Sequence, residues 1–260
     1  MIKIASFLFI FISLALSFSG CSNLHKNRDV LYQTSTINAL LEGAYDGDIT
    51  FHELKKQGDF GIGTFHALDG EMIALDGNFY QIKSDGTAYP VDSSMKTPFA
   101  VVTFFEPDYT ISIDEQLDYK DLEGYLDSIL PTGNIFYAIK LEGTFSYIKA
   151  RSVPRQNKPY PPLAEAAQHQ KIFEFHDVKG VIVGFRLPQY MKGINVPGYH
   201  LHFITDDRKA GGHLLACKTT DVRVEIDYTA SLYMVLPEKN AFFNLDLTKD
   251  KQNLLDKIEK

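Results

Sequence analysis

The run Gly198-Tyr-His-Leu-His-Phe-Ile-Thr-Asp-Asp-Arg-Lys-Ala-Gly-Gly-His-Leu-Leu215 holds three of the eight histidines of the chain. Side chains alternate between the two faces of a strand, so His200 and His202 should share one face, and the leucine between them should lie on the other. A polar turn and Gly211-Gly212 then lead into a second apolar run that begins at His213. The pattern predicts a β-hairpin that brings three imidazoles together.

Three converging imidazoles with a fourth position open are the ligand set of a catalytic zinc site. Structural zinc sites more often use cysteine, and this sequence contains only Cys21 and Cys217. A histidine in a strand is also commonly an ordinary polar residue, and short histidine motifs occur by chance. From spacing alone, both a metal site and three unrelated polar residues are open.

The composition describes a globular protein with an acidic surface. With 45% hydrophobic and 23% charged residues, a chain of 260 residues can bury a full core. Its net charge of -7 argues against a nucleic-acid partner, which requires a basic face. Abundant Tyr and Phe favour strands over helices.

The N-terminus has the pattern of an export signal over residues 1–20. Lys3 supplies the positive start, and the apolar core from Ile4 to Phe18 is short for a membrane span. Small residues then precede Cys21, which resembles a bacterial lipoprotein signal with lipid attached to the cysteine. We expect an exported protein with residues 21–30 as a polar tether and the lipid as its contact with the membrane; secretion without lipid is the alternative.

The remaining pattern predicts an α+β fold of two mixed or antiparallel β-sheet subdomains with a few short helices. Short β-prone runs end in Gly or Asp-Gly turns. We place an N-terminal subdomain at residues 31–152 and a C-terminal one, with the three histidines and the tail, at 153–260. Residues 135–151 predict a hairpin that turns at Glu142-Gly143.

A zinc ion held by neutral imidazoles keeps its positive charge and acts as a Lewis acid, but it needs neighbours that hold substrate and move protons. Glu71 opens a strand after an Asp-Gly turn, and Arg151 ends one before Ser-Val-Pro. An arginine pairs well with a carboxylate. Glu259 stands one residue from the C-terminus. Each of the three, taken alone, is better explained as an exposed charge.

A series of motifs, in this order and spacing, resembles the α-acetolactate decarboxylase family from about Tyr32 to the C-terminus. The motifs are Gly61-Ile-Gly-Thr-Phe65, Leu68-Asp-Gly-Glu-Met-Ile-Ala-Leu-Asp-Gly77, Ala150-Arg-Ser-Val-Pro154, Pro159-Tyr-Pro-Pro-Leu163 and the histidine hairpin. The resemblance implies an α+β homodimer that converts (S)-2-acetolactate to (R)-acetoin and carbon dioxide with Zn²⁺ and without an organic cofactor.

The same resemblance implies roles for individual residues. The metal ligands would be His200, His202 and His213. Arg151 would hold the substrate carboxylate, Glu71 and Glu259 would manage protons, and Thr64 would line the pocket, with Glu238 as an alternative to Glu259. Two other functions are open: a zinc hydrolase with Glu71 as general base, and a metal-binding surface lipoprotein without activity.

Overall fold

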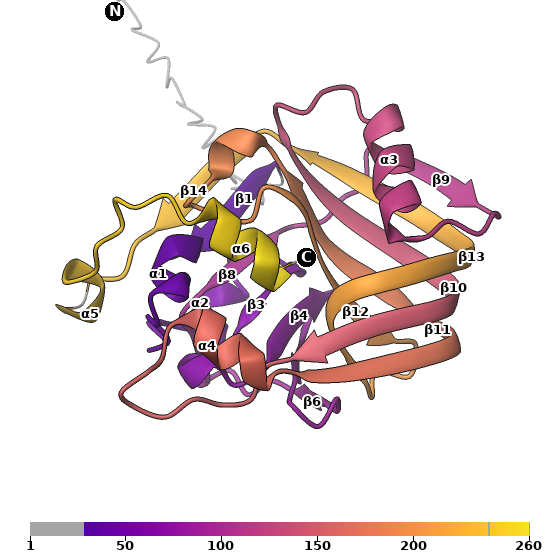
Figure 1. Cartoon of the computed structure of the whole chain (residues 1–260). Coiled ribbons are helices and arrows are strands. Elements are labelled where there is room, and N and C mark those ends of the chain that lie inside the picture. The colour runs from indigo at the N-terminus through magenta and orange to yellow at the C-terminus, as the bar shows by residue number, and fades with distance from the viewer. Residues whose placement is uncertain (1–28, 239, 260) are drawn as a thin grey trace, which may run out of the picture.

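The computed structural model describes residues 29–238 and 240–259 (Figure 1). The predicted signal, Cys21 and most of the tether lie outside the described residues. None of the described helices is long and apolar enough to cross a membrane.

The first sheet has seven strands in the order β14-β1-β8-β3-β4-β5-β6. Neighbouring strands are antiparallel, except for β1 and β14, which run parallel. The strands are β1 (Val30–Thr34), β3 (Phe60–Thr64), β4 (Glu71–Leu75), β5 (Asn78–Ile82), β6 (Ala88–Pro90), β8 (Ala100–Thr103) and β14 (Ser231–Val235). At the β4–β5 turn, Asp76 and Gly77 have φ angles of 51° and 75°, the left-handed pair that a tight hairpin requires.

The second sheet has the order β10-β11-β12-β13-β9, and β10 also pairs with β13. Its strands are β9 (Tyr109–Ile113), β10 (Phe136–Ser152), β11 (Lys171–Leu187), β12 (Gly198–Thr205) and β13 (Gly211–Thr229). Four of these strands therefore close into a ring of long, curved strands (Figure 1). A short pair, β2 (Ile49–Thr50) and β7 (Lys96–Thr97), is antiparallel. The expected α+β fold of two mixed or antiparallel sheets is confirmed.

Short helices cover the sheets and carry side-chain caps where the sequence supplies them. They are α1 (Ile37–Leu41), α2 (Phe51–Leu54), α3 (Tyr119–Ile129), α4 (Leu163–Ala166), α5 (Asn240–Phe243) and α6 (Gln252–Glu259), with 3₁₀ turns η1 (His66–Leu68), η2 (Ala167–His169) and η3 (Gln189–Met191). The Thr36 hydroxyl accepts the backbone N–H of Ala39 and starts α1. Helix α6 lies beside α1, where Leu255 packs into one apolar cluster with Ile37 and Leu41 (Figure 1).

The two sheets exchange strands across the boundary that we placed after residue 152. Strands β9 and β10 precede it but pair with β13 and β11, whereas β14 returns to the first sheet beside β1. One buried cluster joins Leu31 and Phe60 of the first sheet to Phe136 and Phe185 of the second. The sheets consequently share one buried cluster, in addition to a cluster within each sheet.

The predicted hairpin at Glu142-Gly143 is wrong, because β10 continues as a single strand through both residues. Gly143 lies opposite Gly180 of β11. On its other side, a Cβ atom at Gly143 would lie 2.1 Å from the carbonyl oxygen of Asp221 on β13. The glycine therefore permits the close approach of a neighbouring strand and does not mark a turn.

The buried carboxyl group of Asp227 on β13 should make the stability of the fold depend on pH. Burial raises the pKa of this carboxyl from 3.8 to about 7, against the hydrogen bond that it accepts from the N–H of Glu106. The native state holds the proton more tightly than the unfolded state, so stability is lost as pH rises from about 4 to about 7. Asp227→Asn should therefore raise the free energy of unfolding at pH 8 by about 1–2 kcal/mol after allowance for solvent screening, with no gain at pH 4. Urea denaturation at both pH values measures this. Asp221→Asn, an exposed site on the same strand, is the control, and an equal gain at pH 4 would contradict the explanation.

Candidate active site

The three histidines of the hairpin converge as predicted. Strands β12 and β13 pair antiparallel with His202 directly opposite His213, and alternation along β12 places His200 on the same face. The ring centroids are 5.1 to 5.3 Å apart. One possible ligand nitrogen from each ring lies within 4.8 Å of the other two, and all three residues are buried. The convergence that the spacing predicted is confirmed.

The surroundings keep these rings neutral and orient at least one of them. Burial lowers the pKa of all three imidazoles, that of His200 to about 3, and the charge of Arg151 lowers them further. His202 Nδ1 lies 2.9 Å from the carbonyl oxygen of Met72 on β4, to which it donates. Nε2 of His202 is then left with its lone pair, buried and without a hydrogen-bond partner in the part of the chain that the structure describes. A neutral ring oriented by a backbone carbonyl fits the requirements of a metal ligand.

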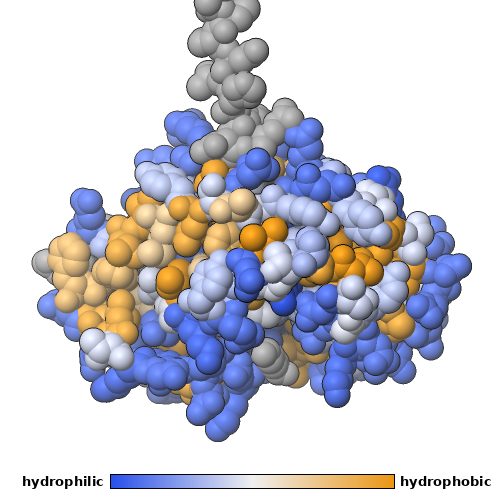
Figure 2. Space-filling model, turned by 90° about the horizontal axis from the view of Figure 1, so that it is seen from above, coloured by the Kyte–Doolittle hydropathy of each residue, from blue (hydrophilic) through white to orange (hydrophobic). Residues whose placement is uncertain are grey.

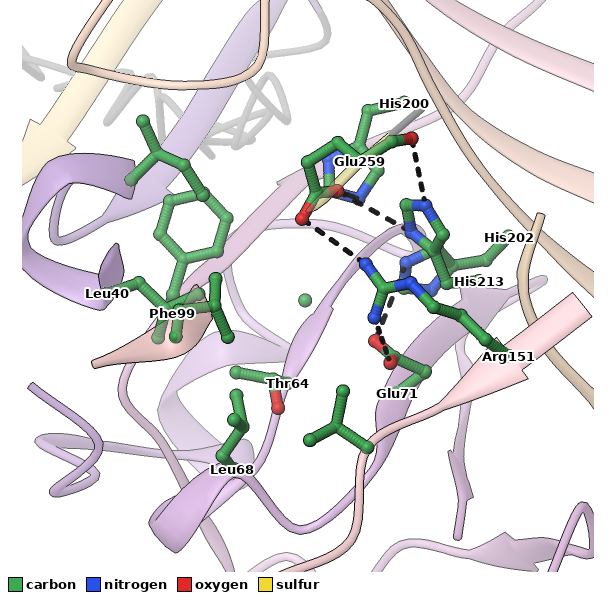
Figure 3. Close-up of a pocket in the computed structure, with 14 residues that line it drawn as sticks. Leu40, Thr64, Leu68, Glu71, Phe99, Arg151, His200, His202, His213 and Glu259 are labelled. Carbon is green, nitrogen blue, oxygen red and sulfur yellow. Dashed lines mark hydrogen bonds and ion pairs between the residues drawn. The ribbon is translucent and has the colours of Figure 1, made fainter. Parts of the chain in front are cut away.

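Arg151, Glu71 and Glu259 form a buried ionic group beside the rings (Figure 3). Arg151 Nη1 lies 3.3 Å from Glu71 Oε1, and its Nη2 lies 3.3 Å from Glu259 Oε1. The second oxygen of each carboxyl faces a histidine: Glu259 Oε2 is 3.4 Å from His200 Nε2, and Glu71 Oε2 is 3.9 Å from His202 Nε2. The three predicted residues therefore come together from β4, β10 and α6.

The charges of this group are unbalanced. Burial raises the pKa of Glu71 to about 7 and also raises the pKa of Glu259, while Arg151 lowers both. When both carboxyls are ionised, one guanidinium faces two carboxylates and an uncompensated negative charge is buried, which is costly. A divalent cation at the neighbouring histidines would compensate that negative charge and leave a net positive charge for an anionic substrate. The residues that are present therefore fit a metal ion.

The opposite side of the pocket is apolar. Its lining residues are Ile37, Leu40, Gly63, Leu68, Phe99, Val153 and Leu163. Thr64 also lines it, but its hydroxyl donates to the carbonyl oxygen of Gly70 at 2.7 Å. In Figure 3 the oxygen of Thr64 points away from the histidines. The volume of this cavity is about 30 Å³.

Sequence reasoning missed the apolar wall of this pocket. Leu40 and Phe99 are hydrophobic residues in a short helix and next to a strand, and such residues are typical of any core. The two C-terminal glutamates differ in position. Glu238 is exposed and lines a separate surface depression with Glu53 and Lys56, whereas Glu259 reaches Arg151.

Known proteins are similar to this chain in sequence and in fold. A family model for α-acetolactate decarboxylase matches residues 31–249. The α-acetolactate decarboxylase of Methanosarcina mazei is 55% identical over 232 residues, which cover 89% of this chain and 81% of that protein. The enzyme of Methylococcus capsulatus is 48% identical, with 90% of each chain covered.

A crystal structure of α-acetolactate decarboxylase from Bacillus subtilis superposes with a TM-score of 0.87 at 45% identity. The match covers 88% of this chain and 99% of that one. The family model spans the strands that carry the histidines, Glu71 and Arg151. The chain therefore belongs to the α-acetolactate decarboxylase family of carboxy-lyases.

Proposed function

We propose that this enzyme converts (S)-2-acetolactate to (R)-acetoin and carbon dioxide, and that it requires zinc to do so. The observation that supports this most directly is the buried arrangement of three neutral imidazoles beside an arginine that lies between two carboxyl groups. The substrate is inferred from the relatives, which are α-acetolactate decarboxylases.

The residues that would hold the metal are His200, His202 and His213. When bound, the ion supplies positive charge that stabilises the electron pair left on the substrate as carbon dioxide departs. His202 is already oriented for this by its hydrogen bond to the Met72 carbonyl.

Arg151 would bind the carboxylate that the reaction removes. A guanidinium presents donors in a planar fork, so it can orient a carboxylate through two hydrogen bonds. Its side chain is only 4% exposed, which keeps water from competing for those donors. Because the carboxylate leaves as neutral carbon dioxide, Arg151 returns to Glu71 and Glu259 at the end of each turnover.

Glu71 and Glu259 would manage the protons. Loss of carbon dioxide breaks the bond between the carboxylate and its carbon, and that carbon must gain one proton, while the hydroxyl and ketone oxygens have the same protonation in substrate and product. One carboxyl group comes from β4 and the other from α6, so the two enter the pocket from different elements. Delivery of the proton to one face of the carbon by one of them would give a single enantiomer of acetoin.

Metal removal tests the proposal directly. We expect purified protein to form acetoin from (S)-2-acetolactate, to lose at least about 100-fold in rate after dialysis against a chelator, and to recover with added zinc. Metal content, measured by emission spectrometry, should follow the rate. A zinc hydrolase would cleave an ester without forming acetoin, and an inactive binding protein would hold zinc without product. Either result would contradict the proposal.

We further propose a homodimer. Strand β14 lies at the edge of the first sheet, and large apolar side chains are exposed there and in the following segment: Leu232, Tyr233, Val235, Leu236 and Phe243. Hydrophobic atoms gather on that side of the molecule in Figure 2. Unpaired edges of this kind are normally covered. Light scattering should give twice the mass of one chain, and the mass of a single chain would contradict the dimer.

Export and lipid attachment at Cys21 stay predictions from the signal pattern. Both would be supported if the unaltered protein is bound to the membrane and the Cys21→Ala variant is released into the medium.

A further inference from the structure

The apolar wall of the pocket has a chemical counterpart in the substrate. Three polar groups of 2-acetolactate, its carboxylate, hydroxyl and ketone, match the histidines, Arg151 and the two glutamates. What remains of the molecule is two methyl groups. Figure 3 shows Leu40, Leu68 and Phe99 on the side of the pocket away from Arg151 and Glu71. A substrate oriented by its polar groups would direct its alkyl groups at that wall.

We propose that Leu40 is a specificity-determining residue that limits the length of the alkyl groups that the substrate can carry. This inference rests on the proposed function. Leu40 is 7% exposed although it belongs to a buried cluster, and it lines the pocket. Leu68 and Phe99 stand beside it in the same cluster.

The wall is held in place from behind. Helix α1 begins at the Thr36 cap, and a buried network in which Asn195 donates to Gln33 fixes the strand that precedes it. The cluster that contains Leu40 also contains Leu255 of α6, the helix that brings Glu259 to the site. A longer alkyl group would therefore have to displace a packed wall, and one further methylene in such a pocket changes kcat/KM by roughly 10–200-fold.

Three substrates that differ only in one alkyl group provide the test: 2-hydroxy-3-oxobutanoates with a methyl, ethyl or propyl substituent at carbon 2. We expect kcat/KM of the unaltered enzyme to fall with each added methylene. Leu40→Ala should raise the ratio of propyl to methyl kcat/KM at least about tenfold. Leu40→Phe should lower the ratio of ethyl to methyl.

Leu41→Ala is the matched control. Leu41 has the same residue type, helix and cluster, but it is not among the residues that line the pocket in the described chain. We expect it to leave the ratios unchanged. Leu40→Val, with a smaller shift in the same direction, replaces Leu40→Ala if that variant does not fold by circular dichroism.

Two outcomes would overturn the assignment of Leu40. One is an equal loss on all three substrates, which would mean that Leu40 supports the fold alone. The other is an identical shift in Leu41→Ala, which would reflect general loosening of the cluster. Absence of carbon dioxide release from the methyl compound by the unaltered enzyme is distinguishable from both, because it would overturn the proposed function and this inference with it.

Discussion

His202→Ala is expected to remove the bound metal and to lower kcat/KM by about three orders of magnitude or more, since metal charge is worth several kcal/mol at a transition state. His202 is 1% exposed, its Nδ1 is held by the Met72 carbonyl, and its Nε2 faces the site. Alanine removes a ligand and leaves two imidazoles, which no longer define a site for a tetrahedral ion.

Two measurements separate this explanation from simple unfolding. Metal content should fall from about one ion per chain to none while the circular dichroism spectrum is retained. His169→Ala is the control because His169 is exposed at the end of η2. Full turnover by a metal-free His202→Ala enzyme would show that the three histidines do not support the reaction.

The histidine hairpin could be predicted because its information is local. Alternation along β12 and a Gly-Gly turn determine which side chains share a face, and His202 does lie opposite His213. Local patterns failed at Gly143, where the glycine accommodates the backbone of Asp221 from a distant strand. A glycine that close packing requires and a glycine that a turn requires cannot be told apart in the sequence, so only the fold distinguishes them.

Local sequence patterns could not predict the ionic group of Arg151, Glu71 and Glu259, for a different reason. Glu71 and Arg151 stand 80 residues apart, and Glu259 lies a further 108 residues along the chain. A charged residue near a terminus is normally solvated. The burial of Glu259 depends on α6 docking through Leu255, a tertiary contact that composition does not encode. Local pattern named these residues as candidates, and the resemblance to a family gave them their roles.

Glu259→Gln is expected to retain the metal and lose about 10²–10⁴-fold in kcat, the usual contribution of a general acid or base. Glutamine has the shape of glutamate and keeps an oxygen that can accept the hydrogen bond from Arg151, but it cannot exchange a proton. The side chain of Glu259 is 7% exposed, so water is poorly placed to substitute for its carboxyl group. Glu238→Gln, at an exposed site, is the control and should be fully active.

The stereochemistry of the product tells which carboxyl group delivers the proton. If Glu259 protonates the carbon, the slow residual reaction of Glu259→Gln takes its proton from water and the excess of (R)-acetoin should fall, as chiral chromatography would measure. If Glu71 does so, the excess should persist while the rate falls, because Glu259 then acts only on an oxygen. Removal of residues 252–260 should resemble Glu259→Gln in rate, since it deletes the same carboxyl group. An unchanged rate after that deletion would exclude any part for the tail in proton transfer and would assign that role to Glu71, the other carboxyl group that the described residues place beside Arg151.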